Sequence, residues 1–181
     1  MHKHSPPSRI KKFYLFYLII LFFIYPLSPF LFTSFLDFKE PAFLLPIAIE
    51  GKIPIRSDIY GDGHFGAARS GGRRLHKGID IRADIGEPVK ASKSGAASVE
   101  WEKNGMGKYV RIIHPRGYST LYGHLSEITI KDRRWVWQGE EIGKVGKTGN
   151  ANYRGMQAHL HFEIRYKNVH LDPLNFFREP R

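Results

Sequence analysis

The segment AHLHFEI, residues 158–164, places two histidines one residue apart in what reads as a β-strand. Side chains alternate along a strand, so His159 and His161 would share one face at a separation of ~6.6 Å, with Leu160 turned to the buried face. In such a pair, one imidazole can bind a metal ion while its neighbour reaches an atom held by that ion. Two solvated surface histidines fit this pattern equally well, so the pair alone does not decide.

The segment HKGIDI, residues 76–81, adds a histidine and a carboxylate. In an extended strand, His76 and Asp80 would lie ~13 Å apart, too far to bind one ion. We therefore expect the chain to bend at Gly78, which has the backbone freedom for it, while the two isoleucines pack inward. Two histidines and one carboxylate, with one coordination position open, form a known catalytic zinc ligand set.

The rest of the chain predicts an all-β domain to position these residues. From Gly51 onward, short runs rich in Val, Ile and Tyr, such as KYVRIIHP and YSTLYGHL, alternate with glycine or proline. No segment after Leu36 has a helical period. We expect one compact antiparallel β domain, sandwich-like or barrel-like, over residues 51–177, and a short tail at 178–181.

The N-terminal part predicts a membrane-targeting helix. A basic tail, residues 1–12, precedes an uncharged apolar run at 13–36, which is the pattern of a signal-anchor or transmembrane segment with a cytoplasmic N-terminus. Pro26 and Pro29 interrupt this run, but no Ala-x-Ala-like cleavage site follows it, so a retained anchor is favoured over a cleaved signal. Residues 37–50 are expected to form a linker.

The composition narrows the class of partner. A formal net charge of +11 at pH 7 indicates an acidic partner, such as nucleic acid, anionic lipid or an acidic extracellular polymer. The absence of cysteine excludes disulfide bonds and thiolate metal ligands. Because the apolar segment points to export, we expect a partner in the cell envelope and no nucleic acid.

Three motifs follow one another in the chain: HxxxD, a histidine within TLYGHLS, and HxH. They are formed by His76, Asp80, His124, His159 and His161. Together they resemble the signature of the lysostaphin/LytM-type zinc endopeptidases, which cut the peptide bridges of bacterial peptidoglycan. The resemblance covers most of the chain after Arg56. It weakens in ITIKDRRWVW, residues 128–137, which concerns loop shape and the substrate groove more than the chemistry.

The resemblance implies that one zinc ion is bound by His76, Asp80 and His161. It also implies that His124 and His159 are an unligated catalytic pair. The ion would polarise the scissile carbonyl and lower the pKa of a water nucleophile, while two imidazoles that titrate near neutrality divide the acid–base and oxyanion tasks. Which histidine is the base stays open, as does the choice between a D-alanyl cross-link and a glycyl bridge in the stem peptides.

Several nearby residues have a functional and an ordinary interpretation. Tyr122 is expected to share the face of His124 and is a candidate oxyanion donor, although core or rim packing is favoured. Glu163 is expected either to orient a ligating ring or to form a surface ion pair. Trp135 and Trp137 are expected on one face, in packing or along a groove. A basic cluster precedes the HxxxD motif and comprises Arg69, Arg73 and Arg74. We expect it either to be a solvated loop or to bind carboxylates of the stem peptides.

Other functions compete with this interpretation. The chain could be an inactive LytM-type regulator of other wall hydrolases, although all five motif residues are present. A non-haem iron oxygenase uses the same ligand set but needs no further histidines. A wall- or membrane-binding module would leave the histidines without a task. We therefore expect a monomeric zinc endopeptidase of the bacterial envelope, anchored in the inner membrane with its domain on the periplasmic or extracellular side, or secreted after cleavage.

Overall fold

The apolar run from Phe13 to Leu36 is helical along its whole length. Helix α1 (Ser8–Ile24) continues through a 3-10 turn, η1 (Tyr25–Leu27), into helix α2 (Ser28–Lys39). Pro26 and Pro29 lie in the first turns of η1 and α2, where a proline costs no helical hydrogen bond because the first N–H groups have no partner in the helix. The segment Phe13–Lys39 is long and apolar enough to cross a membrane, which confirms the expected apolar helix.

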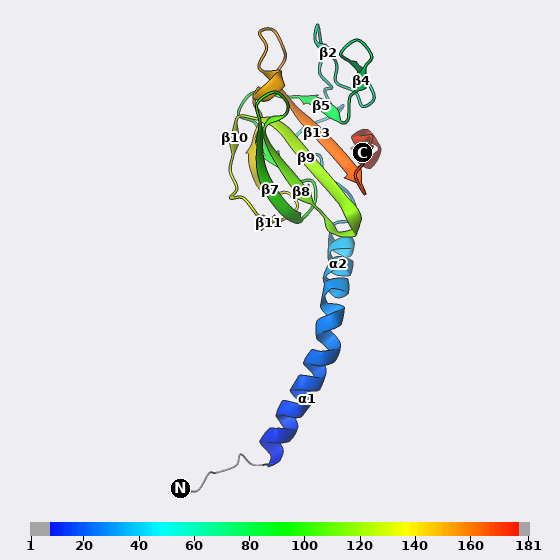
Figure 1. Ribbon diagram of the computed structural model, residues 1–181, viewed down its shortest axis with the longest axis vertical. Coiled ribbons are helices and arrows are strands. Elements are labelled where there is room, and N and C mark those ends of the chain that lie inside the picture. The colour runs from blue at the N-terminus through cyan, green and yellow to red at the C-terminus, as the bar shows by residue number, and fades with distance from the viewer. Residues whose placement is uncertain (1–7, 178–181) are drawn as a thin grey trace. The chain divides into compact units, whose positions relative to one another are not determined.

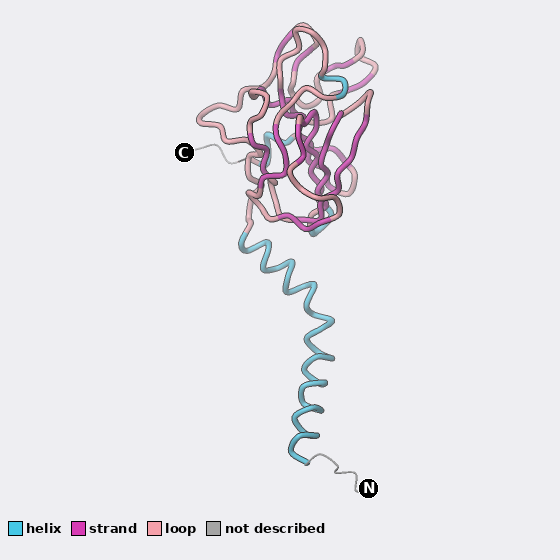
Figure 2. Tube along the Cα trace, turned by 90° about the vertical axis from the view of Figure 1, so that its left-hand side faces the viewer, coloured by secondary structure: helices cyan, strands magenta, loops and turns pink. Residues whose placement is uncertain are grey.

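The computed structural model describes residues 8–177, and these divide into two units. The first unit ends at Pro41 and is helical, whereas the second begins at Ala42 and contains every strand of the described chain (Figure 1). Figure 2 shows the same division by secondary structure, since helix within the second unit is limited to short 3-10 turns. The predicted tail at 178–181 and the first seven residues lie outside the described part.

Runs of alternating residues form a seven-stranded sheet in which neighbouring strands run antiparallel. In spatial order its strands are β11 (Arg134–Val136), β7 (Gly95–Glu102), β8 (Gly107–Ile113), β9 (Tyr118–Leu125) and β13 (His159–Tyr166), followed by β5 (Ile79–Arg82) and β14 (Val169–Leu171). Strands β5 and β14 pair with successive halves of one edge of β13, while β9 pairs with its other edge.

Shorter strands complete the β unit. A three-stranded antiparallel sheet consists of β10 (Glu127–Ile128), β12 (Glu141–Lys144) and β6 (Pro88–Lys90). Two ribbons precede β5: β1 (Ser57–Asp58) with β2 (Gly61–Asp62), and β3 (Ala68–Arg69) with β4 (Arg74–Leu75). The 3-10 turns are η2 (Pro115–Gly117), η3 (Gly149–Ala151) and η4 (Pro173–Phe176). The predicted antiparallel all-β class is confirmed.

Both sheets contribute to one hydrophobic core. Ile81, Val110 and Leu160 come from the large sheet, and Val89 and Ile142 come from the small one; all five side chains are fully buried. Removal of this apolar surface from water is the main stabilising term that holds the two sheets together.

The segment expected as a linker, residues 37–50, differs from that expectation. Its first three residues belong to α2, and Phe43 and Ile47 are buried in the core of the β unit. Pro41 and Pro46 do prevent a regular helix or strand here, but they do not prevent apolar side chains from being buried. Most of this segment is therefore part of the β unit.

Strand β13 follows the predicted period of two. Leu160 and Phe162 are fully buried in the core, and His159 and His161 lie on the opposite face. The chain bends at Gly78 as expected. Backbone freedom is not the reason for glycine here, since its φ is outside the left-handed region; the reason is lack of space for a side chain. A Cβ atom at Gly78 would lie 2.2 Å from the carbonyl oxygen of Phe162, so only glycine allows β5 to begin this close to β13.

Candidate metal centre

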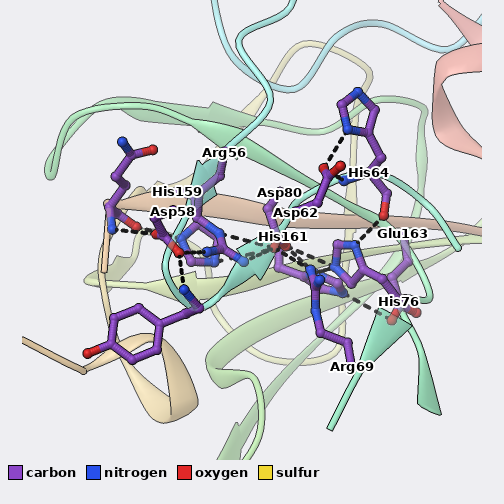
Figure 3. Close-up of polar contacts among 12 residues, drawn as sticks. Arg56, Asp58, Asp62, His64, Arg69, His76, Asp80, His159, His161 and Glu163 are labelled. Atoms are coloured by element: carbon purple, nitrogen blue, oxygen red, sulfur yellow. Dashed lines mark hydrogen bonds and ion pairs between the residues drawn. The ribbon is translucent and has the colours of Figure 1, made fainter. Parts of the chain in front are cut away.

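The three predicted ligands converge where β5 meets β13 (Figure 3). His161 and Asp80 are register partners across the two strands, and His76 lies just before the bend. Asp80 Oδ1 is 2.8 Å from His161 Nδ1 and 3.0 Å from His76 Nε2, and the two nitrogens are 3.1 Å apart. All three side chains are buried, and they form a group that could hold a metal ion.

The outward contacts of the two imidazoles decide which nitrogen faces this centre. His76 Nδ1 lies 2.9 Å from the carbonyl oxygen of His64, which can only accept, so Nδ1 carries the proton. His161 Nε2 lies 3.1 Å from Glu163 Oε1 and donates to that carboxylate. In neutral rings, the lone pairs of His76 Nε2 and His161 Nδ1 therefore point to the same place as Asp80 Oδ1.

This donor set fits a small cation. Three electron-pair donors separated by 2.8–3.1 Å repel one another unless positive charge lies between them. Tetrahedral zinc holds its nitrogen and oxygen ligands ~3.3 Å apart, which is close to this spacing. Burial lowers the pKa of His161, but hydrogen bonds with Asp80 and Glu163 raise it to about 9, so positive charge is favoured at this centre. Burial raises the pKa of Asp80, yet its contacts with the imidazoles of His161 and His76 hold this pKa well below its usual range.

Two arginines bind the other oxygen of Asp80. The buried Arg56 donates to Oδ2 through Nη2 at 2.9 Å and Nε at 3.3 Å, and Arg69 donates through Nη2 at 3.3 Å. Because Oδ2 is occupied in this way, Oδ1 is left for the metal centre. Motif spacing offers no signal for Arg56. The prediction that Arg69 is solvated is wrong, because only 13% of its side chain is exposed.

Arg56 also connects the metal ligand to one of the other histidines (Figure 3). Its Nη1 donates to Asp58 Oδ1 at 2.6 Å, and Asp58 Oδ2 accepts the backbone N–H of Gln157 at 3.1 Å. The carbonyl oxygen of Gln157 accepts from His159 Nδ1 at 2.7 Å. One chain of contacts thus fixes both Asp80 and the ring of His159.

The two further predicted histidines lie beside the centre. His159 Nε2 is 3.9 Å from Asp80 Oδ1, and the ring centroids of His124 and His159 are 5.0 Å apart. His124 Nδ1 donates to the carbonyl of Thr148 at 2.9 Å, as His159 Nδ1 does to Gln157, so Nε2 of each neutral ring carries a lone pair. Burial lowers the pKa of both rings, that of His124 to about 3, so both are neutral at pH 7.

His124 faces the cleft because strand β9 contains a bulge. Where β8 advances by two residues, from Lys108 to Val110, its partner β9 uses three, from Leu125 to Tyr122. His124 has a φ of 63°, in the left-handed region that histidine enters only at some cost in strain. Bulges of this kind often turn a side chain toward an active site.

The same bulge corrects the prediction for Tyr122. Its ring is fully buried and packs against Phe162 in the core, on the face opposite His124. Its hydroxyl oxygen accepts hydrogen bonds from Ser92 N at 2.8 Å and Thr120 Oγ1 at 2.9 Å. The prediction that Tyr122 shares the face of His124 is therefore wrong. The contacts of Tyr122 support a packing role in the core.

Glu163 is fully buried behind the metal centre. Its Oε1 faces His161 Nε2, and its Oε2 accepts from Arg165 Nη2 at 2.6 Å. Burial raises the pKa of Glu163, but His161 and Arg165 lower it to about 2, so it is ionised at neutral pH. These contacts fit the orienting role and not the surface ion pair.

All five motif residues line one cleft of about 520 Å³. Its walls include residues of the β3–β4 ribbon, the turn between β7 and β8, and the loop after η3. Tyr60 and Tyr153, both of which line the cleft, stack with ring centroids 5.6 Å apart. The rings of Trp135 and Trp137 meet edge to face with centroids 6.1 Å apart, and neither residue is among the described residues that line this cleft.

Replacing Arg56 with methionine should weaken zinc binding and the fold together. The change leaves the buried carboxylates of Asp58 and Asp80 with less compensating charge, and removing one partner of a buried ion pair costs ~3–5 kcal/mol. Loss of a contact that orients a metal ligand lowers metal affinity by ~10–100-fold. Zinc affinity is measured by competition with a chromophoric chelator, and the free energy of unfolding by urea titration.

Arg134→Met is the matched control for this variant. Arg134 pairs with Glu140 at the surface, with 42% of its side chain exposed, so its loss should cost only ~0–1 kcal/mol and leave zinc affinity unchanged. Equal zinc affinities for Arg56→Met and the parent protein would show that Arg56 does not position Asp80.

The family model described as peptidase family M23 matches residues 74–173, just over half of the chain. The chain belongs to peptidase family M23. The resemblance to the lysostaphin/LytM-type enzymes is thereby confirmed, and the matched range of the M23 domain contains all five motif residues.

The relatives of this chain include both peptidases and a protein that occurs in a complex. The catalytic domain of lysostaphin from Staphylococcus simulans is 31% identical, with a TM-score of 0.54 over 66% of this chain and 90% of that one. A chain in the crystal structure of the SpoIIIAH and SpoIIQ complex is 30% identical, with a TM-score of 0.59 over 75% of this chain and 99% of that one. The DD-carboxypeptidase/endopeptidase Mpg of Neisseria meningitidis serogroup B is 41% identical over 102 residues, which are 56% of this chain and 23% of the relative. The M23 chain thus spans less than a quarter of that curated relative.

Proposed function

We propose that this M23 protein is a zinc-dependent endopeptidase that hydrolyses peptide cross-links of bacterial peptidoglycan. The observation that carries the proposal is the convergence of His76 Nε2, His161 Nδ1 and Asp80 Oδ1 beside two unligated imidazoles in one cleft. Metal-assisted amide hydrolysis uses a cation that polarises the carbonyl, a proton acceptor and a proton donor; the three ligand atoms could hold the cation, and the two imidazoles could serve as acceptor and donor.

The unligated histidines handle the protons. A zinc ion bound by the three ligands would supply a Lewis acid that polarises the scissile carbonyl and lowers the pKa of water. Nε2 of one unligated histidine accepts a proton from the attacking water and a proton is then delivered to the leaving amine. The hydrogen bonds of His124 and His159 to backbone carbonyls keep both rings in the tautomer whose Nε2 can accept. Both rings meet this requirement. The geometry therefore supports a role for both histidines without assigning which one is the base.

A regulator of other wall hydrolases is the second candidate, because a relative of this chain occurs in a protein complex. A regulator would need the surface of the cleft but not its ligand atoms. Here each ligand has an orienting contact, from the carbonyl of His64 to His76, from Glu163 to His161 and from Arg56 to Asp80. An iron oxygenase could use the same three ligands but would leave the other two histidines without a task.

The test is digestion of purified sacculi by the full-length protein, with mass spectrometry of the released muropeptides. We expect stoichiometric zinc in the purified protein and new peptide termini at cross-links. Removal of the metal with a chelator should abolish the release, and added zinc should restore it, because the ion supplies the Lewis acid. Protein that contains no zinc and releases no muropeptide would favour the regulator.

We further propose that the protein acts in the cell envelope, held at the inner membrane by Phe13–Lys39, with the β unit on the periplasmic or extracellular side. The length and apolar character of this segment and the basic residues before it support the proposal. Recovery of a mature protein free of the membrane, with its N-terminus beyond Leu36, would contradict anchoring.

A further inference from the structure

One wall of the cleft carries more positive charge than the metal centre uses. Arg69 and Arg74 are register partners across the β3–β4 ribbon, and Lys77 follows the ligand His76 directly in the chain. All three side chains line the same cleft as the five motif residues. We call Arg69, Arg74 and Lys77 the cationic wall.

The charges of the cationic wall are largely uncompensated. Arg74 and Lys77 are exposed, and neither forms an ion pair within the described chain. Arg69 contacts Asp80 through Nη2 only, while its Nη1 is buried and has no hydrogen-bond partner among the described residues. A further anion here would relieve repulsion among like charges.

The protein itself supplies little negative charge to this part of the cleft. Asp80 already serves two arginines and the metal centre, and Glu163 is taken by His161 and Arg165. A third carboxylate in the lining belongs to Glu102, which comes from a different wall, at the end of β7. The cleft is therefore polarised, with free cations on the segment that leads into the metal site.

A carboxylate on the substrate fits this arrangement. Arginine pairs with carboxylates through two parallel hydrogen bonds, and such charge-assisted contacts are stronger than neutral ones. A cross-link to a diamino acid presents free carboxylates near the scissile amide, whereas a glycine bridge presents none. We propose that the cationic wall binds a free carboxylate of the peptide beside the scissile bond, so that the enzyme selects acidic D-alanyl cross-links over glycine bridges.

This inference rests on the proposed endopeptidase function and adds the class of cross-link to it. Its test compares two soluble cross-linked muropeptide dimers, one with free diaminopimelate carboxylates and one with the same carboxylates amidated. We expect the parent protein to have an about tenfold lower KM for the free-acid dimer, because the cationic wall adds contacts to a charged group. The variant Arg74→Gln/Lys77→Gln should keep stoichiometric zinc and lose this preference.

Arg73→Gln is the matched control. Arg73 belongs to the same exposed turn, but its Nε donates to the carbonyl of Ser70 at 3.1 Å, and it does not line the cleft. This control removes one positive charge from the turn that precedes Arg74, outside the cleft, and should keep the parent preference. A parent protein that does not distinguish the dimers, or a double variant that distinguishes them as the parent does, would overturn the inference.

A binding measurement separates this inference from the proposed function. If the parent protein hydrolyses neither dimer, the endopeptidase function fails, but the affinity of the zinc-loaded protein for each dimer still reports on the cationic wall. We then expect tighter binding of the free-acid dimer by the parent and by Arg73→Gln only. Equal binding by the parent and the double variant overturns the inference in this case as well.

Discussion

Replacing His161 with alanine should remove stoichiometric zinc and wall-digesting activity together. His161 Nδ1 is one of the three converging ligand atoms, and two ligands alone bind zinc weakly. We expect zinc content to fall well below one per chain and the release of muropeptides to drop by more than ~10³-fold, since the Lewis acid and the lowered pKa of water are lost with the ion. Atomic absorption and sacculus digestion measure the two quantities on the same preparation.

Unfolding does not account for this expected loss. Without His161, Asp80 keeps its contacts with Arg56 and Arg69, and Glu163 keeps Arg165. No buried carboxylate is therefore left without a cation, and the urea transition should shift only modestly. A His161→Ala protein that retains stoichiometric zinc would show that the metal is bound elsewhere.

The part of the site that sequence predicts well is the part fixed by local periodicity. The alternation in HLHFEI puts His159 and His161 on one face and Leu160 on the other, and pairing with β5 then sets Asp80 opposite His161. The bend before β5 also follows from distance alone, because an extended chain cannot bring His76 and Asp80 to one ion. The all-β class has the same origin, in short runs of β-forming residues between turns.

The part that sequence misses depends on contacts between distant strands. The bulge that re-aims His124 and buries Tyr122 exists because β8 and β9 advance by unequal steps, which neither strand's own alternation reveals. The reason for Gly78 is equally remote, since a Cβ atom there would meet the backbone of Phe162 on β13. A period of two predicts faces only while the register is regular.

Buried charge is the other feature that motif spacing does not predict. Arg56 lies outside every motif, yet its guanidinium joins Asp80 to Asp58 inside the protein. A buried arginine is rare without partners, so its place becomes predictable only once two carboxylates are known to lie beside it. Residues 37–50 show the same limit, because prolines exclude regular structure without showing that Phe43 and Ile47 are buried.

Replacing His124 with alanine should abolish most activity and leave zinc in place. His124 supplies none of the three converging atoms, and its Nδ1 is bonded to Thr148 rather than to a ligand. Removal of a positioned acid–base group lowers the rate by ~10²–10⁴-fold. Because His124 has a φ of 63°, alanine adds backbone strain at this position, so His124→Asn serves as the second variant, since asparagine tolerates the left-handed region better.

Both His124 variants should bind zinc with parent stoichiometry and release few muropeptides. Equal losses in the two variants assign the effect to the missing imidazole, whereas a loss in alanine alone assigns it to the backbone of the bulge. The His161→Ala variant should lose activity because it loses the metal, whereas the His124 variants should lose activity with the metal still bound. This difference separates a metal ligand from an acid–base group. If His124→Asn digests sacculi at the parent rate, the catalytic role of His124 is wrong and the bulge in β9 needs another explanation.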